Sequence, residues 1–100
     1  MTYTLVHKLH VSHDIQQIVN YYKEISPKLA TDFLYRLREA NKHIILNPLG
    51  FQLKYKNVRT LMLKQFPYQI HYLIDYKLNQ IIILVVIHAY KNPNDYSIRM

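Results

Sequence analysis

The sequence predicts an α+β fold in which a first strand is followed by a helix hairpin and then by a three-stranded antiparallel meander. Apolar residues recur at helical spacing between positions 11 and 46, and a Ser-Pro pair at 26–27 interrupts them. Three runs rich in β-branched and aromatic residues follow, separated by short turns. A chain of 100 residues has the size of one domain, so we expect residues 1–100 to form a single domain.

The first strand and the first helix are expected within residues 2–25. Residues 2–9, TYTLVHKL, alternate in character and are rich in strand formers. Ser12 is the expected N-cap of the helix that follows, with Asp14 favourably placed in its first turn. Its buried side is marked by apolar residues at alternating intervals of four and three: Val11, Ile15, Ile18, Tyr22 and Ile25.

The second helix is expected to start at Ser26 and Pro27. Proline at the first helical position loses no hydrogen bond, and serine caps free backbone amides. The helix should run to about Leu46, with Asn47, Pro48 and Gly50 ending it. Its stripe consists of Ala30, Phe33, Leu34, Leu37, Ile44 and Ile45. Because the joint between the helices is so short, they should fold back on each other as a hairpin.

Residues 51–57, FQLKYKN, are expected to form a basic, aromatic loop before the meander. The three meander strands are then expected at about 58–64, 68–74 and 81–88, and their short connections favour antiparallel pairing. The last strand is apolar at both its odd and its even positions from Ile81 to Ile87, which is typical of a strand covered on both sides.

The strand at 68–74 raises the question of what its two faces do. Successive side chains alternate between faces, so the even positions from Tyr68 to Ile74 form an apolar set. The other face carries Gln69 and His71, which would suit either a solvated surface or the floor of a site. One helix hairpin covers only one face of a sheet, so the second face needs the C-terminal tail, a second copy or a partner.

Composition excludes several classes of protein. The chain has no cysteine, which rules out disulfides, thiolate metal sites and a cysteine nucleophile. Its longest apolar run, 81–87, is far shorter than the roughly 20 residues of a bilayer helix. With no signal-peptide pattern, we expect a soluble, cytoplasmic protein. The net charge is +7, and residues 51–100 hold seven basic against two acidic residues, which favours an anionic partner.

No standard enzyme signature is present, and no cofactor is expected. With a single glycine there is no Gly-rich phosphate loop, and the chain has neither a His-Glu-x-x-His motif nor a nucleophile elbow. His7, His10 and His13 straddle a strand, a connection and a helix start without an acidic or cysteine ligand beside them, so we interpret them as surface histidines rather than a metal site.

His71 and His88 are the histidines that most plausibly have a catalytic role. Metal-free RNA cleavage needs a base, cations for the developing phosphorane charge and a proton donor. The two histidines, together with Lys64, Lys91 and Tyr96, supply these residue types. Many basic, tyrosine-rich surfaces do so as well, and a structural role for either histidine is the stronger interpretation.

The chain resembles the RelE/ParE family of bacterial toxins from type II toxin-antitoxin modules. The resemblance covers nearly the whole chain and depends on the order and spacing of five segments: DIQQIVNYY (14–22), ISPKLATDFL (25–34), NPLGF (47–51), FPYQIHYLID (66–75) and VIHAYKNP (86–93). It implies that one face of the 68–74 strand packs on the hairpin, and that the other belongs to the family's concave functional side.

Two activities occur within this family. RelE-like members are ribosome-dependent mRNA endonucleases, whereas ParE-like members poison DNA gyrase without cleaving nucleic acid. Here Arg59 matches one nuclease cation, but Leu61 stands two positions on, and Tyr68 and Gln69 occupy the place of an arginine. The FPY and HAYKNP segments also look more like the ParE branch.

The resemblance therefore implies a ParE-like, plasmid-stabilisation type of toxin that binds and inhibits DNA gyrase. Its partner would be a cognate acidic antitoxin, with which it forms a hetero-oligomer. The alternatives are a RelE-like endoribonuclease acting on mRNA at the ribosome, or a degenerate, non-toxic member. The nuclease alternative would use Arg59, Lys91, Tyr96 and His88. The expected target or antitoxin surface consists of Arg59, Lys64, His71, His88, Lys91 and Tyr96.

Overall fold

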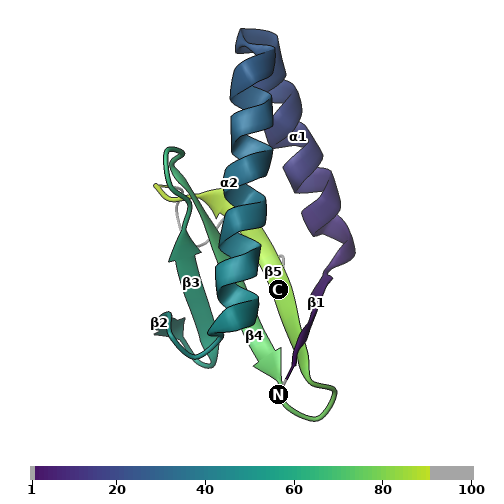
Figure 1. Ribbon diagram of the computed structural model, residues 1–100, viewed down its shortest axis with the longest axis vertical. Helices are drawn as coiled ribbons and strands as arrows, with labels where there is room; N and C mark the ends of the chain where they lie inside the picture. Colours follow the sequence, from purple (N-terminus) through teal and green to yellow (C-terminus); the bar gives the residue numbers. More distant parts are fainter. Residues whose placement is uncertain (1, 91–100) are drawn as a thin grey trace.

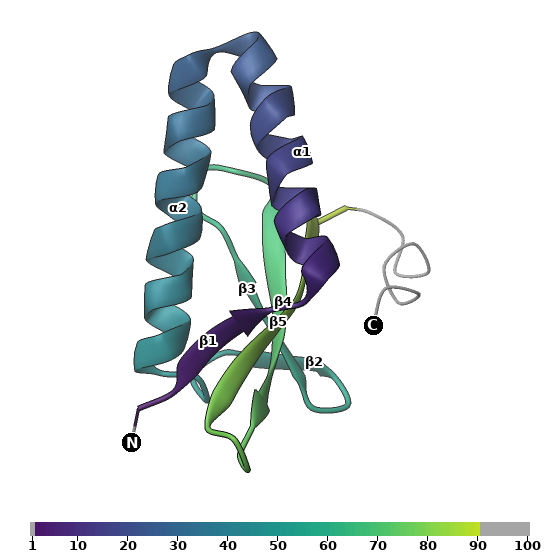
Figure 2. The ribbon, with the colours of Figure 1, turned by 90° about the vertical axis from the view of Figure 1, so that its right-hand side faces the viewer.

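A helix hairpin packs against one face of a five-stranded sheet (Figure 1). The computed structural model describes residues 2–90. In chain order the elements are β1 (Thr4–His7), α1 (Leu9–Ile25), α2 (Pro27–Leu46), β2 (Gln52–Tyr55), β3 (Val58–Met62), β4 (Tyr68–Asp75) and β5 (Gln80–His88). Seen from the side, the two helices run antiparallel and extend beyond the sheet (Figure 2). The predicted α+β fold with its helix hairpin is confirmed.

The sheet has the order β1-β5-β4-β3-β2, with β1 parallel to β5 and all other pairs antiparallel. The meander thus has one strand more than predicted, because β2 forms within residues 51–57, where a loop was expected. Gln52, Leu53 and Lys54 are exposed, so this edge strand carries no buried alternation for sequence analysis to detect. A tight turn, with Lys56 at a φ of 47°, returns the chain to β3.

The start of α1 differs from the prediction. The helix begins at Leu9 with Lys8 at the N-cap position, so Ser12 lies inside it and Asp14 lies beyond its first turn, where it is buried. Pairing with the sheet determines this start, because the backbone N–H of Lys8 still donates to the carbonyl of Ile83 (3.2 Å). The chain therefore turns from strand to helix without a separate capping segment.

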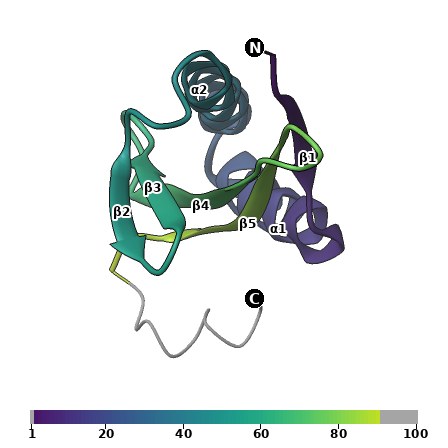
Figure 3. The same cartoon turned by 90° about the horizontal axis from the view of Figure 1, so that it is seen from below.

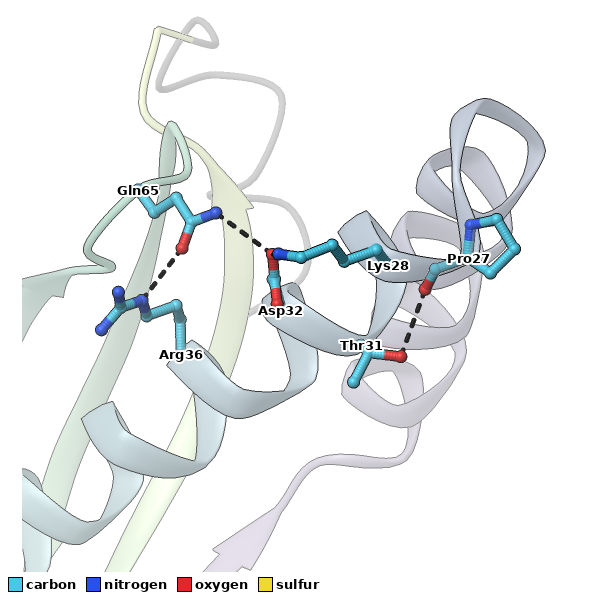
Figure 4. A network of polar contacts seen from close by, with 6 residues as sticks. All are labelled: Pro27, Lys28, Thr31, Asp32, Arg36 and Gln65. Carbon is cyan, nitrogen blue, oxygen red and sulfur yellow. Dashed lines mark hydrogen bonds and ion pairs between the residues drawn. The ribbon is translucent and has the colours of Figure 1, made fainter.

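The second helix begins at Pro27, as predicted, although the side chain of Ser26 makes no capping hydrogen bond. A polar network joins α2 to the turn between β3 and β4 (Figure 4). Gln65 accepts from Nε of Arg36 (3.1 Å) and donates to Asp32 (3.5 Å). Asp32 in turn pairs with Lys28 at 2.8 Å, and this hydrogen bond is the main reason that the pKa of Asp32 is lowered. The network holds the turn against the outside of the helix.

The main core lies between the hairpin and the sheet. Phe33 is fully buried, and its ring centroid lies 5.9 Å from Tyr22, 5.5 Å from Phe66 and 5.7 Å from Tyr68. The buried members of this core are Val11, Ile18, Phe33, Leu37, Ala40, Ile44, Leu63, Phe66, Ile70, Tyr72, Ile74, Ile81, Ile83 and Val86. Ile25 was predicted to belong to the stripe but is 58% exposed. It is the last residue of α1, at the end of the hairpin that extends beyond the sheet (Figure 2).

An irregularity in the pairing of β5 with β4 changes which residues face the helices. His71 pairs with Val85 and Tyr72 with Ile83, so Leu84 is an extra residue on β5. Ile81 and Ile83 face the hairpin before this bulge and Val86 faces it afterwards, which corrects the simple odd-even alternation predicted for the strand. The imidazole Nε2 of His10 lies 2.8 Å from the carbonyl oxygen of Leu84, so α1 supplies a hydrogen bond at the bulge.

The second face of the sheet is also buried at its centre. Gln69 and His71 on β4 and Val85 and Ile87 on β5 are all buried there, so a solvated surface is excluded for this part of the strand. Figure 3 shows both helices to one side of the sheet, so this face is not covered by the hairpin. From β2, Tyr55 lies over His71, with 6.0 Å between the ring centroids. The C-terminal tail, which was one of the expected covers, lies outside the described residues.

Neither helix in residues 2–90 combines the length and the apolar character needed to cross a membrane.

Candidate functional site

His71 is held in the interior rather than presented at an open site. Its side chain is 0% exposed, and its Nδ1 lies 3.4 Å from the hydroxyl oxygen of Tyr55. Burial, assisted by the positive charge of Lys54, lowers the pKa of His71 to about 4. The ring is therefore neutral at pH 7. A base with so low a pKa has little proton affinity to offer near neutral pH.

His88 lies at the end of β5, directly opposite Tyr68 on β4. Its ring centroid is 5.3 Å from that of Tyr68 and 5.6 Å from that of Tyr90. The Nδ1 atom accepts a hydrogen bond from the backbone N–H of Tyr90 (3.2 Å). In the neutral ring the proton is therefore on Nε2. His88 is part of an aromatic cluster where β4 begins and β5 ends, and it is only partly buried.

Arg59 is engaged with the loop that follows α2. Its Nη1 donates to the carbonyl of Phe51 at 2.7 Å and more weakly to that of Leu49 at 3.4 Å. Its cross-strand neighbour Tyr72 donates its hydroxyl hydrogen to the carbonyl of Pro48. Burial raises the pKa of Tyr72 to about 12, so this donor keeps its proton. Together the two side chains tie the 48–51 loop to the sheet.

The predicted site residues do not converge on one point among the described residues. Arg59 pairs with Tyr72 and His88 with Tyr68, so the two lie about 13 Å apart along the strands and about 10 Å apart across them. His71 points to the opposite face, and Lys64 is exposed in the turn after β3. Lys91 and Tyr96 lie outside the described residues. Among residues 2–90, the candidate residues therefore place no acid-base pair and cation together around a single phosphate.

The three N-terminal histidines do not gather into one cluster either. Within residues 2–90, no three His, Cys, Asp or Glu side chains are grouped as metal ligands would be. His10 is instead bonded to the Leu84 carbonyl, and His7 has its pKa lowered by burial.

An open hollow lies on the helix side of the sheet, at the end where β4 finishes. It is lined by Leu53, Lys56, Asn57, Arg59, Ile74 and Tyr76. Sequence analysis identified 51–57 as basic and aromatic but assigned no site to it. The signal was present in FQLKYKN, where lysines alternate with large apolar residues. What the sequence could not provide was the pairing that places Leu53 beside Arg59. A second groove follows the outer side of α2 between Tyr35 and Leu46.

Comparison with known proteins identifies the fold. No family model matches the sequence, and no curated protein matches it significantly. Among solved structures, a chain of the chromosomal ParDE TA (toxin-antitoxin) system from P. aeruginosa is similar, with a TM-score of 0.74. The two share the same fold. The match covers 87% of this chain and 96% of that chain at 21% sequence identity. The RelE/ParE resemblance seen in the sequence is thereby confirmed at the level of the fold.

Replacing Arg59 with lysine is expected to destabilise the protein even though the charge is kept. Both bonds are made by Nη1 at the far end of the arginine side chain. A lysine places its ammonium on a shorter and more flexible stem, so the 48–51 loop loses at least one charge-assisted hydrogen bond. We expect the free energy of unfolding to fall by about 1 to 2 kcal/mol, measured by urea denaturation. Lys56→Gln, which removes a nearby exposed charge, is the matched control and should change stability little. Equal stability of R59K and the parent would show that the bonds to the loop are unimportant.

Proposed function

We propose that this chain is the toxin component of a type II toxin-antitoxin module, neutralised by a cognate antitoxin, and that it acts in the cytoplasm by binding and inhibiting DNA gyrase. The observation that carries the proposal is the shared fold with a chain of the ParDE TA system, which extends over almost the whole of that chain. The five sequence segments that resemble the RelE/ParE family point the same way.

A binding mechanism is favoured over nuclease chemistry by the arrangement of the polar residues. The one buried histidine, His71, is neutral at pH 7 and lies on the opposite face of the sheet from Arg59. His88 is on the same face as Arg59 but too far along the strands for both to contact one phosphate. A toxin that occludes or traps its target needs a docking surface and no such constellation.

An acidic antitoxin is the partner that the charge favours. The chain carries a net charge of +7, and its second half is the more basic. An antitoxin segment that is disordered when free would be steered by this charge and would order on binding, with apolar anchors supplying most of the affinity. The resulting complex would be a hetero-oligomer.

The test is inducible expression of the chain alone and together with the product of the neighbouring gene. We expect growth arrest with the chain alone, accompanied by stalled gyrase-DNA complexes and intact mRNA, and rescue when the neighbour is co-expressed and co-purifies. Cleaved mRNA on translating ribosomes would overturn the gyrase proposal in favour of the endonuclease alternative. Unimpaired growth with a bound neighbour would indicate a non-toxic relative.

A single variant sharpens this distinction. If the toxin acts by binding, His88→Ala should change toxicity by no more than a few fold, provided that circular dichroism shows a folded protein. If it is a nuclease that uses His88 for proton transfer, the loss should be about 10²- to 10⁴-fold. A loss in that range, measured as mRNA cleavage by purified protein on ribosomes, would count decisively for the nuclease.

A further inference from the structure

The hollow at the end of β4 is assembled from three strands and two turns that are distant in the sequence. Leu53 and Arg59 are cross-strand partners in β2 and β3, so their side chains lie on the same face of the sheet. Ile74 projects from β4 on that face, and Tyr76 follows directly after the strand. The β2–β3 turn closes the remaining side with Lys56 and Asn57. Figure 1 shows this end of the sheet below the C-terminal end of α2.

The walls of the hollow expose apolar surface that nothing in residues 2–90 covers. Leu53 is 50% exposed and Tyr76 is 63% exposed, while Ile74 between them is buried and forms an apolar floor. Such surface gains from contact with an aliphatic or aromatic side chain of a partner, because that contact removes it from water. The apolar walls alone would not select one class of partner.

The charged groups around the hollow determine which class of partner it would bind. Lys56 and Arg59 both line it, and residues 2–90 contribute no carboxylate to the lining. The nearby Asp75 is engaged in its own turn, where its Oδ1 accepts the backbone N–H groups of Lys77 (3.0 Å) and Leu78 (3.1 Å). A ligand with a carboxylate would therefore meet two cations and no opposing negative charge.

Arg59 is well prepared for such a ligand. Its Nη1 bonds to the 48–51 loop hold the guanidinium in place, whereas Nε and Nη2 have no acceptor among the described residues. A guanidinium fixed on one side and open on the other binds a carboxylate with little loss of side-chain freedom. The same bonds to the 48–51 loop thus stabilise the loop and hold the Arg59 guanidinium in position.

The side chains that line the hollow favour a peptide over nucleic acid as its ligand. Two of its three apolar side chains are aliphatic, and Tyr76 is the only aromatic ring that the described part of the chain contributes to the lining. Single-stranded nucleic acid is usually bound by several aromatic stacking surfaces along a row of cations. A peptide that carries a carboxylate next to an aliphatic side chain satisfies both the cations and the walls.

We propose that this hollow is a docking site for an acidic peptide segment of a partner protein, in which an Asp or Glu carboxylate pairs with Arg59 and Lys56 and a neighbouring aliphatic side chain contacts Leu53, Ile74 and Tyr76. The site does not depend on the toxin proposal, because it follows from the charges and walls of the hollow itself. It also differs from a strand added at a sheet edge, since the contacts are made by side chains.

The experiment is an NMR titration of the full ¹⁵N-labelled chain with the peptide Ac-Gly-Asp-Leu-Glu-Leu-Gly-amide. The matched neutral probe replaces Asp by Asn and Glu by Gln, and a third probe is the RNA hexamer rU6. We expect the acidic peptide to shift the backbone amides of Leu53, Lys56, Asn57 and Tyr76, and to bind at least tenfold more tightly than the neutral peptide. Its affinity should fall as salt is added.

Variants around the hollow test the assignment directly. Lys56→Gln and Tyr76→Ala should each weaken binding of the acidic peptide at least threefold. Lys77→Gln removes an exposed charge from the same turn region without touching the lining, so it should leave the affinity within twofold. The proposal is overturned if the acidic and neutral peptides bind equally, if the shifts map to the groove on α2, or if rU6 occupies the hollow more tightly than the acidic peptide.

Discussion

Replacing Phe33 with alanine is expected to lower the free energy of unfolding by about 3 to 5 kcal/mol. The ring is fully buried and contacts three other aromatic rings that come from α1, the β3–β4 turn and β4. Its removal leaves a cavity where these elements meet, and the surrounding rings are too large and too constrained to fill it. Small domains have about 5 to 15 kcal/mol of stability in total, so F33A should lose a large share of its stability and melt well below the parent.

Urea denaturation followed by circular dichroism measures this effect. The matched control is Tyr35→Ala on the same helix, because Tyr35 is 58% exposed and faces away from the sheet. Y35A should keep nearly the whole stability of the parent. If F33A and Y35A had equal melting temperatures, the assignment of the buried side of α2 would be wrong.

The helices were predictable because their signal is periodic and redundant. Phe33 and Leu37 were identified from their spacing alone, and both are buried at the centre of the core. The start of α1 was less predictable. Ser12 is a good capping residue, but the backbone bond from Lys8 to Ile83 continues the strand pairing and starts the helix earlier. A contact between segments about 75 positions apart overrides a local preference of this kind.

The strands show a second limit of sequence analysis. Nothing in the composition of β5 marks Leu84 as an extra residue, since every position near it is apolar. Its effect is to reverse the alternation, so that Val86 rather than Val85 faces the helices. The edge strand β2 was missed for the opposite reason, because most of its side chains are exposed and carry no pattern of burial.

The candidate site was the least predictable part. Basic residues and histidines could be identified, but their distances depend on register. Arg59 and His88 lie on the same face of the sheet at different heights, and His71 lies on the other face. The hollow was visible only as an alternation of lysines and apolar residues. That alternation indicates a hollow only once the register that pairs Leu53 with Arg59 is known.

The stability of the protein is expected to fall as the pH is lowered from about 6.5 towards 4, and His71 is the main described group responsible. The pKa of His71 is about 4 in the folded protein, compared with an ordinary value of 6.5 when the chain is unfolded. Above pH 6.5 the ring is neutral in both the folded and the unfolded state, so His71 does not make the free energy of unfolding depend on pH there. Below that pH the His71 ring binds a proton in the unfolded chain but stays neutral in the folded protein. Protonation therefore favours the unfolded state.

The size of this effect follows from the difference between the two pKa values, which corresponds to on the order of 2 to 3 kcal/mol between pH 7.5 and pH 4. The physical cause is that a charged imidazole would be buried at the centre of the sheet, near the positive charge of Lys54. The lowered pKa of His7 adds a smaller contribution of the same sign. Asp32 contributes in the same direction only nearer pH 4, because its lowered pKa favours the folded state above its ordinary pKa.

Urea denaturation at a series of pH values tests this prediction, with His71→Gln compared against His13→Gln. H71Q is expected to be less stable than the parent at neutral pH, because it disturbs a buried site, but to lose much less stability on acidification. H13Q changes an exposed histidine and should retain the pH dependence of the parent. A direct readout is the ¹H NMR titration of the His71 ring, whose resonances should not move between pH 7.5 and pH 5.5. A ring that titrated near pH 6.5 in the folded protein would mean that His71 is in contact with water, and the second face of the sheet would then be open at its centre.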